Sequence, residues 1–204
     1  MTASIMLSDA EAARLHGMAA AAVANVSRGL TDMFGMDVVV KALHVHAVPL
    51  ARIAGLVGSP EVEIIGIYLE AEGDIPGHLL LLLQVTAAFE LCDILLEQPA
   101  GATVSLGEME VSALAEVGNI AGSFFLNTLA DDGGFCLKVS PPSVVCDMAG
   151  ALIDLALVDV AMYADEAIVI NASFEHQGRR MPAWFLAFPD PERLRAVLGA
   201  GGRP

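Results

Sequence analysis

The fold is decided by residues 105–134, which read SLGEMEVSALAEVGNIAGSFFLNTLADDGG. Ser105 and Glu108 have the spacing of a capping box, which predicts that a helix begins here. Gly133 and Gly134 predict where it ends, because glycine adopts positive φ without strain. Almost all residues between these points are apolar or small, and a helix that is apolar nearly all round is normally buried. We therefore expect a long, largely buried helix.

One narrow polar line runs along this helix. At 100° per residue, the polar side chains that fall within about 60° of one another are Ser112, Glu116, Asn119 and Ser123. Glu116 and Asn119 are three residues apart, so both side chains can reach one external group. An amide can orient a water molecule, and a carboxylate can accept hydrogen bonds from a cation. An ordinary exposed helix face could carry the same residues, so the pattern by itself leaves both interpretations open.

Composition and charge limit the class of protein. The 204 residues suit one domain, or two small halves that share a core. The formal net charge of -15 argues against binding nucleic acid or anionic lipid through a basic surface. In the longest stretch with few charges, residues 111–130, Glu116 would cost about 2.5–3.5 kcal/mol at the centre of a membrane. The first residues, MTASIMLSDAEAA, lack the basic region and apolar core of a signal peptide. We expect a cytoplasmic protein without membrane insertion.

The cysteines and histidines do not predict a disulfide or a metal site. Cys92, Cys136 and Cys146 form neither a CxxC pair nor an even count, so we expect them to be reduced and structural. His44 and His46 share one face of a predicted strand, but no cluster of Asp, Glu or Cys accompanies them. We expect the chain to hold no metal and no cofactor of its own.

The predicted elements occur twice in the same order. Ser8 and Glu11 form a second capping box, and the helix that begins there is predicted to end at Gly35. Each long helix precedes a strand, a short helix or loop, a hairpin and a further helix. In the first half these elements are 36–48, 50–58, 63–85 and 86–96, and in the second half they are 135–145, 148–160, 167–188 and 191–198. A Gly-rich tail, residues 199–204, follows.

This order predicts a single α+β domain, residues 1–204, with two pseudo-repeats at about 8–98 and 105–198. We expect the two hairpins to share an antiparallel-rich sheet with both long helices packed on it. A constant offset of 99 aligns Leu30 with Leu129 and Asp32 with Asp131, although few positions match.

The two long helices carry different side chains at the positions that this offset matches. Where the second helix has Ser112, Glu116 and Asn119, the first has Ala13, Gly17 and Ala20. If the fold itself required a polar line, both halves would be expected to keep it.

The polar line also carries a family resemblance. The signature of the CheC/CheX/FliY family of chemotaxis phosphatases resembles three features of this chain: Ser112, the segment EVGNI at 116–120, and Pro142, which twenty-two intervening residues separate from Asn119. That signature is an Asp or Ser, three residues, Glu, two residues, Asn, twenty-two residues and Pro. The stretches VPLARIAGL, IIGIYLEAEGDIPGHLLLLL and LNTLADDGG are also similar to CheC proteins. The likeness extends from about residue 8 to residue 198.

The resemblance implies that the chain dephosphorylates a phosphorylated CheY-like response regulator. In the family, the Asn positions a water molecule for attack on the aspartyl phosphate, and the Glu pairs with a lysine of the regulator. By this resemblance Asn119 and Glu116 are the catalytic residues, with Ser112 and Pro142 in support. Positioning is the main contribution of a protein to phosphoryl transfer, and Mg²⁺ is expected on the regulator. Because Gly17 and Ala20 replace the pair in the first copy, we expect one active site.

A non-catalytic role stays open at this point. Some members of the family work with the deamidase CheD, and others, such as FliY, are located at the flagellar switch. The first helix without the pair is compatible with an adaptor that binds CheD or a CheY-like regulator without hydrolysis. Nothing in the chain resembles the additional switch-binding domain of FliY, so the resemblance favours a free-standing CheC-like protein.

Overall fold

The computed structural model describes residues 8–35, 37–133, 136–160, 165–190 and 192–195. These residues form a mixed α+β fold, as the sequence predicts. Its elements are α1 (Asp9–Phe34), β1 (Val39–Pro49), two 3-10 helices (Leu50–Arg52 and Ala54–Leu56), β2 (Glu63–Gly73), β3 (Gly77–Gln84), α2 (Val85–Leu95), α3 (Glu108–Gly133), β4 (Leu137–Val139), β5 (Ser143–Met148), α4 (Ala149–Val160), β6 (Glu166–His176) and β7 (Arg179–Pro189).

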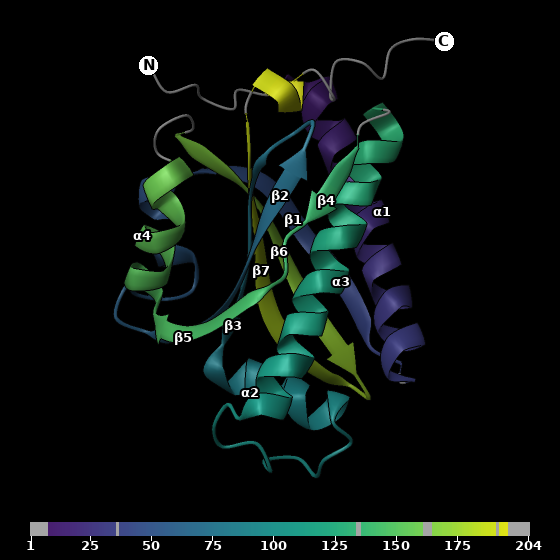
Figure 1. Cartoon of the computed structure of the whole chain (residues 1–204), viewed down its shortest axis with the longest axis vertical. Coiled ribbons are helices and arrows are strands. Elements are labelled where there is room, and N and C mark those ends of the chain that lie inside the picture. The colour runs from purple at the N-terminus through teal and green to yellow at the C-terminus, as the bar shows by residue number, and fades with distance from the viewer. Residues whose placement is uncertain (1–7, 36, 134–135, 161–164, 191, 196–204) are drawn as a thin grey trace.

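Helices cover both faces of a single antiparallel sheet. Figure 1 shows α1 and α3 side by side on one face and α4 on the other, with α2 near the start of α3. The end of α1 and the first turns of α3 line one groove, so these two helices run in opposite directions. Within the described residues, no helix combines the length and the apolar character needed to cross a membrane.

The strand order is symmetric about the centre of the sheet. It is β1-β6-β7-β3-β2-β4, and β5 also pairs with β2. The strand that follows each long helix therefore pairs with the hairpin of the other half, and β7 and β3 meet in the middle. This is the arrangement expected of two similar halves that share one sheet. The repeat boundaries at 8–98 and 105–198 stay a prediction.

The two long helices begin in different ways. At α1, the Ser8 side chain accepts from the Glu11 amide and the Glu11 carboxylate accepts from the Ser8 amide, which confirms this capping box. At α3, the predicted capping box at Ser105 is wrong, because the helix begins at Glu108. There the Gly107 amide donates to Glu110 Oε2 at 3.0 Å, so the carboxylate that caps the first turn lies two residues later than predicted.

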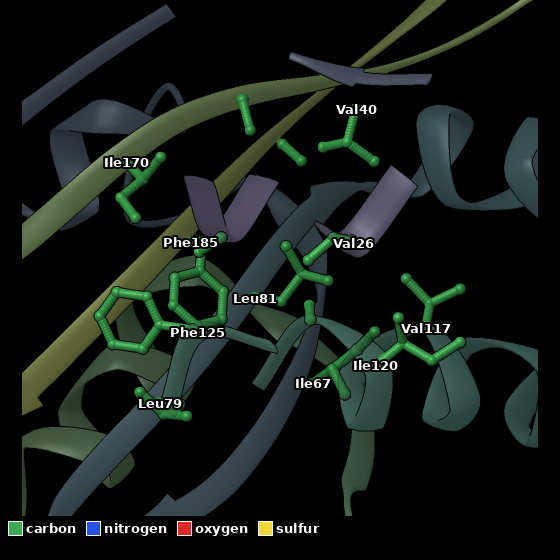
Figure 2. Close-up of a cluster of buried hydrophobic side chains, with 14 of the residues drawn as sticks. Val26, Val40, Ile67, Leu79, Leu81, Val117, Ile120, Phe125, Ile170 and Phe185 are labelled. Atoms are coloured by element: carbon green, nitrogen blue, oxygen red, sulfur yellow. The ribbon is translucent and has the colours of Figure 1, made fainter. Parts of the chain in front are cut away.

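The main core lies between the sheet and the helices α1, α2 and α3. Figure 2 shows side chains of α1 and α3, including Val26, Ile120 and Phe125, among strand residues such as Leu81. The rings of Phe125 and Phe185 are 5.1 Å apart with an interplanar angle of 59°, a tilted arrangement that aromatic pairs favour. A second core lies between the other face of the sheet and α4 with the 3-10 helices.

Several predicted boundaries shift at the chain ends and around prolines. The predicted strand at 135–145 is divided into β4 and β5, because Pro141 and Pro142 cannot donate ladder hydrogen bonds. Of the predicted helix at 191–198, the described part, residues 192–195, is helical. Gly134, which was predicted to end the second helix, and the tail at 199–204 lie outside the described residues. The three cysteines are free, and the buried one is Cys92, whose pKa is raised to about 12 by burial.

Candidate active site

Two glycines fix how α3 lies on the sheet. A Cβ atom on Gly118 would lie 2.4 Å from Ile67 Cγ2, and one on Gly122 would lie 3.1 Å from Val139 Cγ1. The backbone of α3 therefore approaches the strands more closely there than most side chains would allow. With this face of the helix held against the sheet, the polar line points away from the core.

The polar line is partly shielded, and its central pair has no side-chain partner among the described residues. Ser112 is exposed, whereas Glu116, Asn119 and Ser123 are half-buried. Among the described residues, none forms a hydrogen bond or an ion pair with the side chain of Glu116 or Asn119. Half-buried polar groups without internal partners are available to bind an external group.

The proline that was predicted to support the site lies in the link between β4 and β5. Ser140 begins this link, and it is attached to β2 by two hydrogen bonds. Its amide donates to the Glu70 carbonyl at 2.9 Å, and the Glu70 amide donates to Ser140 Oγ at 2.8 Å. These bonds replace ladder pairing where Pro141 and Pro142 have no N–H.

The link passes beside the turn of α3 that carries Asn119. Val139, the last residue of β4 before the link, contacts Gly122 of α3. After the link, Val144 of β5 pairs with Ile67 of β2, and Ile67 contacts Gly118 of α3. Figure 1 shows β4 next to α3 and β5 running from there towards α4, and both strands pair with β2 at the edge of the sheet. Pro142 is therefore brought to the same side of the fold as the pair, half-buried, on the neighbouring segment of chain.

The start of α3 is positioned by a carboxylate that the sequence interpretation missed. Asp93 of α2 is 2% exposed, and it accepts from the Gly101 amide at 2.6 Å and the Thr103 amide at 2.7 Å. Burial alone would raise the pKa of Asp93, but the hydrogen bonds from Thr103 and Gly101 outweigh it and lower the pKa. The one acidic residue in the apolar run Leu91–Leu95 was the available signal.

A groove adjoins the polar line at the start of α3, and it too was not predicted. Its volume is about 490 Å³. It is lined by Met33 and Phe34 at the end of α1, Leu96 after α2, and Glu108, Met109, Ser112, Ala113 and Glu116 of α3. Ser112 and Glu116 therefore belong both to the polar line and to the wall of this groove.

Comparison with known proteins agrees with this arrangement. The model of the CheC-like family matches residues 109–146, which contain the polar line, the link and most of β5. The CheY-P phosphatase CheC of Bacillus subtilis (strain 168) is 33% identical over 150 residues, which cover 70% of this chain and 72% of that protein. The chain belongs to the CheC-like family. It is thus a relative of chemotaxis phosphatases, as the polar line and its spacing to Pro142 predicted.

Solved structures show the same fold at low sequence identity. FliY of Thermotoga maritima superimposes with a TM-score of 0.77 at 15% identity, covering 96% of this chain and 99% of that one. The CheX-CheY-BeF3-Mg+2 complex of Borrelia burgdorferi matches with a TM-score of 0.52 at 17% identity, covering 82% and 94%. The CheC-like fold therefore extends over nearly all of the chain.

The described part of the CheC-like chain offers hydrogen-bonding side chains at the polar line. Among the described residues, no group of three or more His, Cys, Asp or Glu side chains is placed to hold a metal ion. His44 and His46 are both exposed on the edge strand β1. The polar line offers one carboxylate and one amide in adjacent turns, a pair that can bind a cation and orient a water molecule.

Proposed function

We propose that this CheC-like protein hydrolyses the aspartyl phosphate of a CheY-like response regulator in the cytoplasm. The observation that carries the proposal is the pair of Glu116 and Asn119. Both are half-buried on adjacent turns of α3, and neither side chain has a partner among the described residues. The curated relative, whose name gives CheY-P as its substrate, supports the same class of reaction.

In this mechanism, Glu116 binds the regulator and Asn119 positions the attacking water molecule. The Glu116 carboxylate accepts hydrogen bonds from the ammonium group of the regulator's active-site lysine, which fixes the orientation of the two proteins. The Asn119 amide then holds a water molecule in line with the bond between phosphorus and the aspartyl oxygen. The water attacks phosphorus, the aspartyl oxygen leaves with the bonding electrons, and inorganic phosphate is released.

The remaining residues of the motif support this pair. Ser112 is exposed one turn before Glu116, where it can contact the partner at the edge of the interface. Pro142 stiffens the link beside α3, because its ring fixes φ. Mg²⁺ is carried by the regulator in this proposal, so the chain contributes position and hydrogen bonds rather than a metal.

The test is an assay of phosphate loss from the phosphorylated regulator, with and without the protein. Replacing Asn119 with Ala is expected to reduce the accelerated rate by on the order of 100- to 1,000-fold. The matched control is Asn127→Ala, because Asn127 is exposed on the same helix about 12 Å further along. An Asn119→Ala variant as fast as wild type would exclude the proposed role of this amide.

A second candidate function is a non-catalytic adaptor that binds CheD, a CheY-like regulator or the flagellar switch. It is favoured by α1, where Gly17 and Ala20 occupy the positions of the pair, and by the structural likeness to FliY. Binding of the phosphorylated regulator without faster loss of phosphate would favour this adaptor over the phosphatase. Capture of CheD or of switch proteins by the purified chain would then identify the partner.

A further inference from the structure

The groove beside Glu116 is apolar and open to solvent. Two of the side chains that line it are exposed methionines, since 57% of the surface of Met33 and 63% of the surface of Met109 are accessible to solvent. Its volume of about 490 Å³ is in the range of sites that bind ligands or the side chains of partners. Methionine is flexible and polarizable, and proteins use it on surfaces that bind irregular apolar shapes.

The fold does not require this groove. At the offset of 99, the position of Met109 in the first copy is Ala10, and the positions that match Met33 and Phe34 in the second copy are Asp132 and Gly133. The long apolar side chains therefore occur at the end of the helix pair that also carries Glu116 and Asn119. The matching residues at the opposite end of the helix pair, Ala10, Asp132 and Gly133, are small or polar. Gly17 and Ala20, which match the proposed catalytic pair, are also small.

The charges around the groove indicate what kind of surface fits it. Glu108 and Glu116 line it, and no Lys, Arg or His is among its described lining residues. An apolar side chain with a cation next to it would satisfy both the apolar walls and the carboxylates. Because Glu116 lies in the groove wall, the cation that pairs with Glu116 and an apolar residue in the groove would come from one continuous surface.

We propose that this groove is the docking site for an apolar side chain of the phosphorylated response regulator, located next to the lysine that binds Glu116. This inference rests on the proposed function and adds a second point of contact to it. Met33 and Met109 then determine which regulator binds, whereas Asn119 determines how fast the bound phosphate is hydrolysed. The two methionines bind the regulator equally well in the ground state and in the transition state. Their contribution therefore affects KM rather than kcat.

The test compares two variants in the assay with a CheY-like regulator of the same organism, phosphorylated with acetyl phosphate. Met33→Ser with Met109→Ser is expected to raise KM by about 10-fold or more and to leave kcat within about twofold. The matched control is Val158→Ser on α4, because Val158 is 68% exposed on the other side of the sheet. Thermal melts check that all variants remain folded, which is expected because the replaced side chains are at the surface.

The outcomes separate this inference from the proposed function. If wild type is active and Asn119→Ala is not, but the double methionine variant has the KM of wild type, the docking site is wrong and the phosphatase proposal stands. If wild type neither binds the regulator nor accelerates phosphate loss, both are wrong. If wild type is a dimer in sedimentation and the double variant a monomer with normal KM, the groove joins two copies of the chain instead.

Discussion

The helices α1 and α3 have the same length and the same place in the fold, but different surfaces. Each has 26 residues, and both pack on one face of the sheet. On α1, the positions that match Ser112, Glu116 and Asn119 are Ala13, Gly17 and Ala20, all exposed. A helix in this layer thus needs no polar line to fold. The line on α3 is therefore better explained by binding or catalysis than by structure.

The strands that follow the two helices differ in the same region. β1 is continuous over 11 residues, with a register shift between Ala42 and His44. At the matching place in the second half, Pro141 and Pro142 interrupt the pairing with β2 and create the link beside α3. The proposed catalytic pair and the link both belong to the second half, and the apolar groove lies next to the pair, between α3 and the end of α1. The first half keeps the scaffold without the pair or the link.

The largest effect is expected when α3 is given the residues of α1. If the proposed function is right, Glu116→Gly with Asn119→Ala should reduce phosphatase activity on the phosphorylated regulator by about 1,000-fold, because both the proposed lysine contact and the proposed positioning of water are lost. The cost to stability should be only about 1 kcal/mol, mainly from glycine inside a helix. Activity is measured as phosphate release, and folding by circular dichroism. Retention of most of the activity would mean that Glu116 and Asn119 contribute no more to hydrolysis than the matching residues of α1.

Removing Asp93 should show how differently the two helices are anchored. The start of α1 is capped by its own residues, whereas the segment before α3 depends on Asp93. The variant Asp93→Ala leaves the amide of Gly101 and that of the buried Thr103 without an acceptor, which should cost about 2–4 kcal/mol in urea unfolding. Ser8→Ala, the matched change at α1, should cost only about 1 kcal/mol.

The contribution of Asp93 should also depend on pH. Because its pKa is lowered in the folded state, its stabilisation is fully present above the unfolded-state pKa of about 3.9 and is lost as pH falls toward the folded-state pKa. The difference in unfolding free energy between wild type and Asp93→Asn should therefore be constant near neutral pH and shrink below about pH 4. A difference that stays the same down to pH 2 would contradict the lowered pKa.

Two glycine-to-alanine substitutions, one on each long helix, should change the free energy of unfolding in opposite directions. A Cβ on Gly118 would lie 2.4 Å from Ile67, so Gly118→Ala should lower the free energy of unfolding by about 1–2 kcal/mol through overpacking. Gly17 has no heavy atom within 4 Å of a built Cβ, so Gly17→Ala should stabilise the protein by up to about 1 kcal/mol. Thermal and urea unfolding of both variants would measure this. Equal effects would mean that α3 does not lie closer to the sheet at Gly118.

The smallest effect is expected when the pair is transferred to α1. Ala13→Ser, Gly17→Glu and Ala20→Asn place the motif on an exposed face, but without the proline link or the apolar groove. We expect kcat/KM to change by less than about twofold, because a motif in the wrong surroundings does not position its partner. A doubling or more of active sites, measured by titration with the regulator, would show that the polar residues alone are sufficient.

Much of the candidate site could be predicted from local sequence. The spacing of Glu116 and Asn119 on a helical face needs only the helical period, and Ser8 with Glu11 forms the predicted capping box. Ser105 was misassigned because it has the same spacing to Glu108 that a real capping box would have. The Glu110 carboxylate, which caps the first turn from inside the helix, has no such signature.

Contacts between distant segments could not be predicted in this way. In the sequence, Asp93 is one of two acidic residues in a largely apolar helix, and its role follows only from the tertiary structure, in which the loop at 101–103 donates hydrogen bonds to it. Met33 and Met109 are 76 residues apart in the chain, and the groove exists only because α1 and α3 run in opposite directions. No periodicity within either helix contains this information.

The sequence by itself determined the two long helices, the repeated order of elements and the difference between the two polar faces. These follow from residue spacing along one segment, which helical geometry converts directly into a face. The tertiary structure decided how closely α3 lies on the sheet, where the Pro142 link passes and which side chains form the groove. These depend on pairing and packing between segments distant in the chain, where small differences in side-chain size, such as the absence of a Cβ at Gly118, set the position of a whole helix.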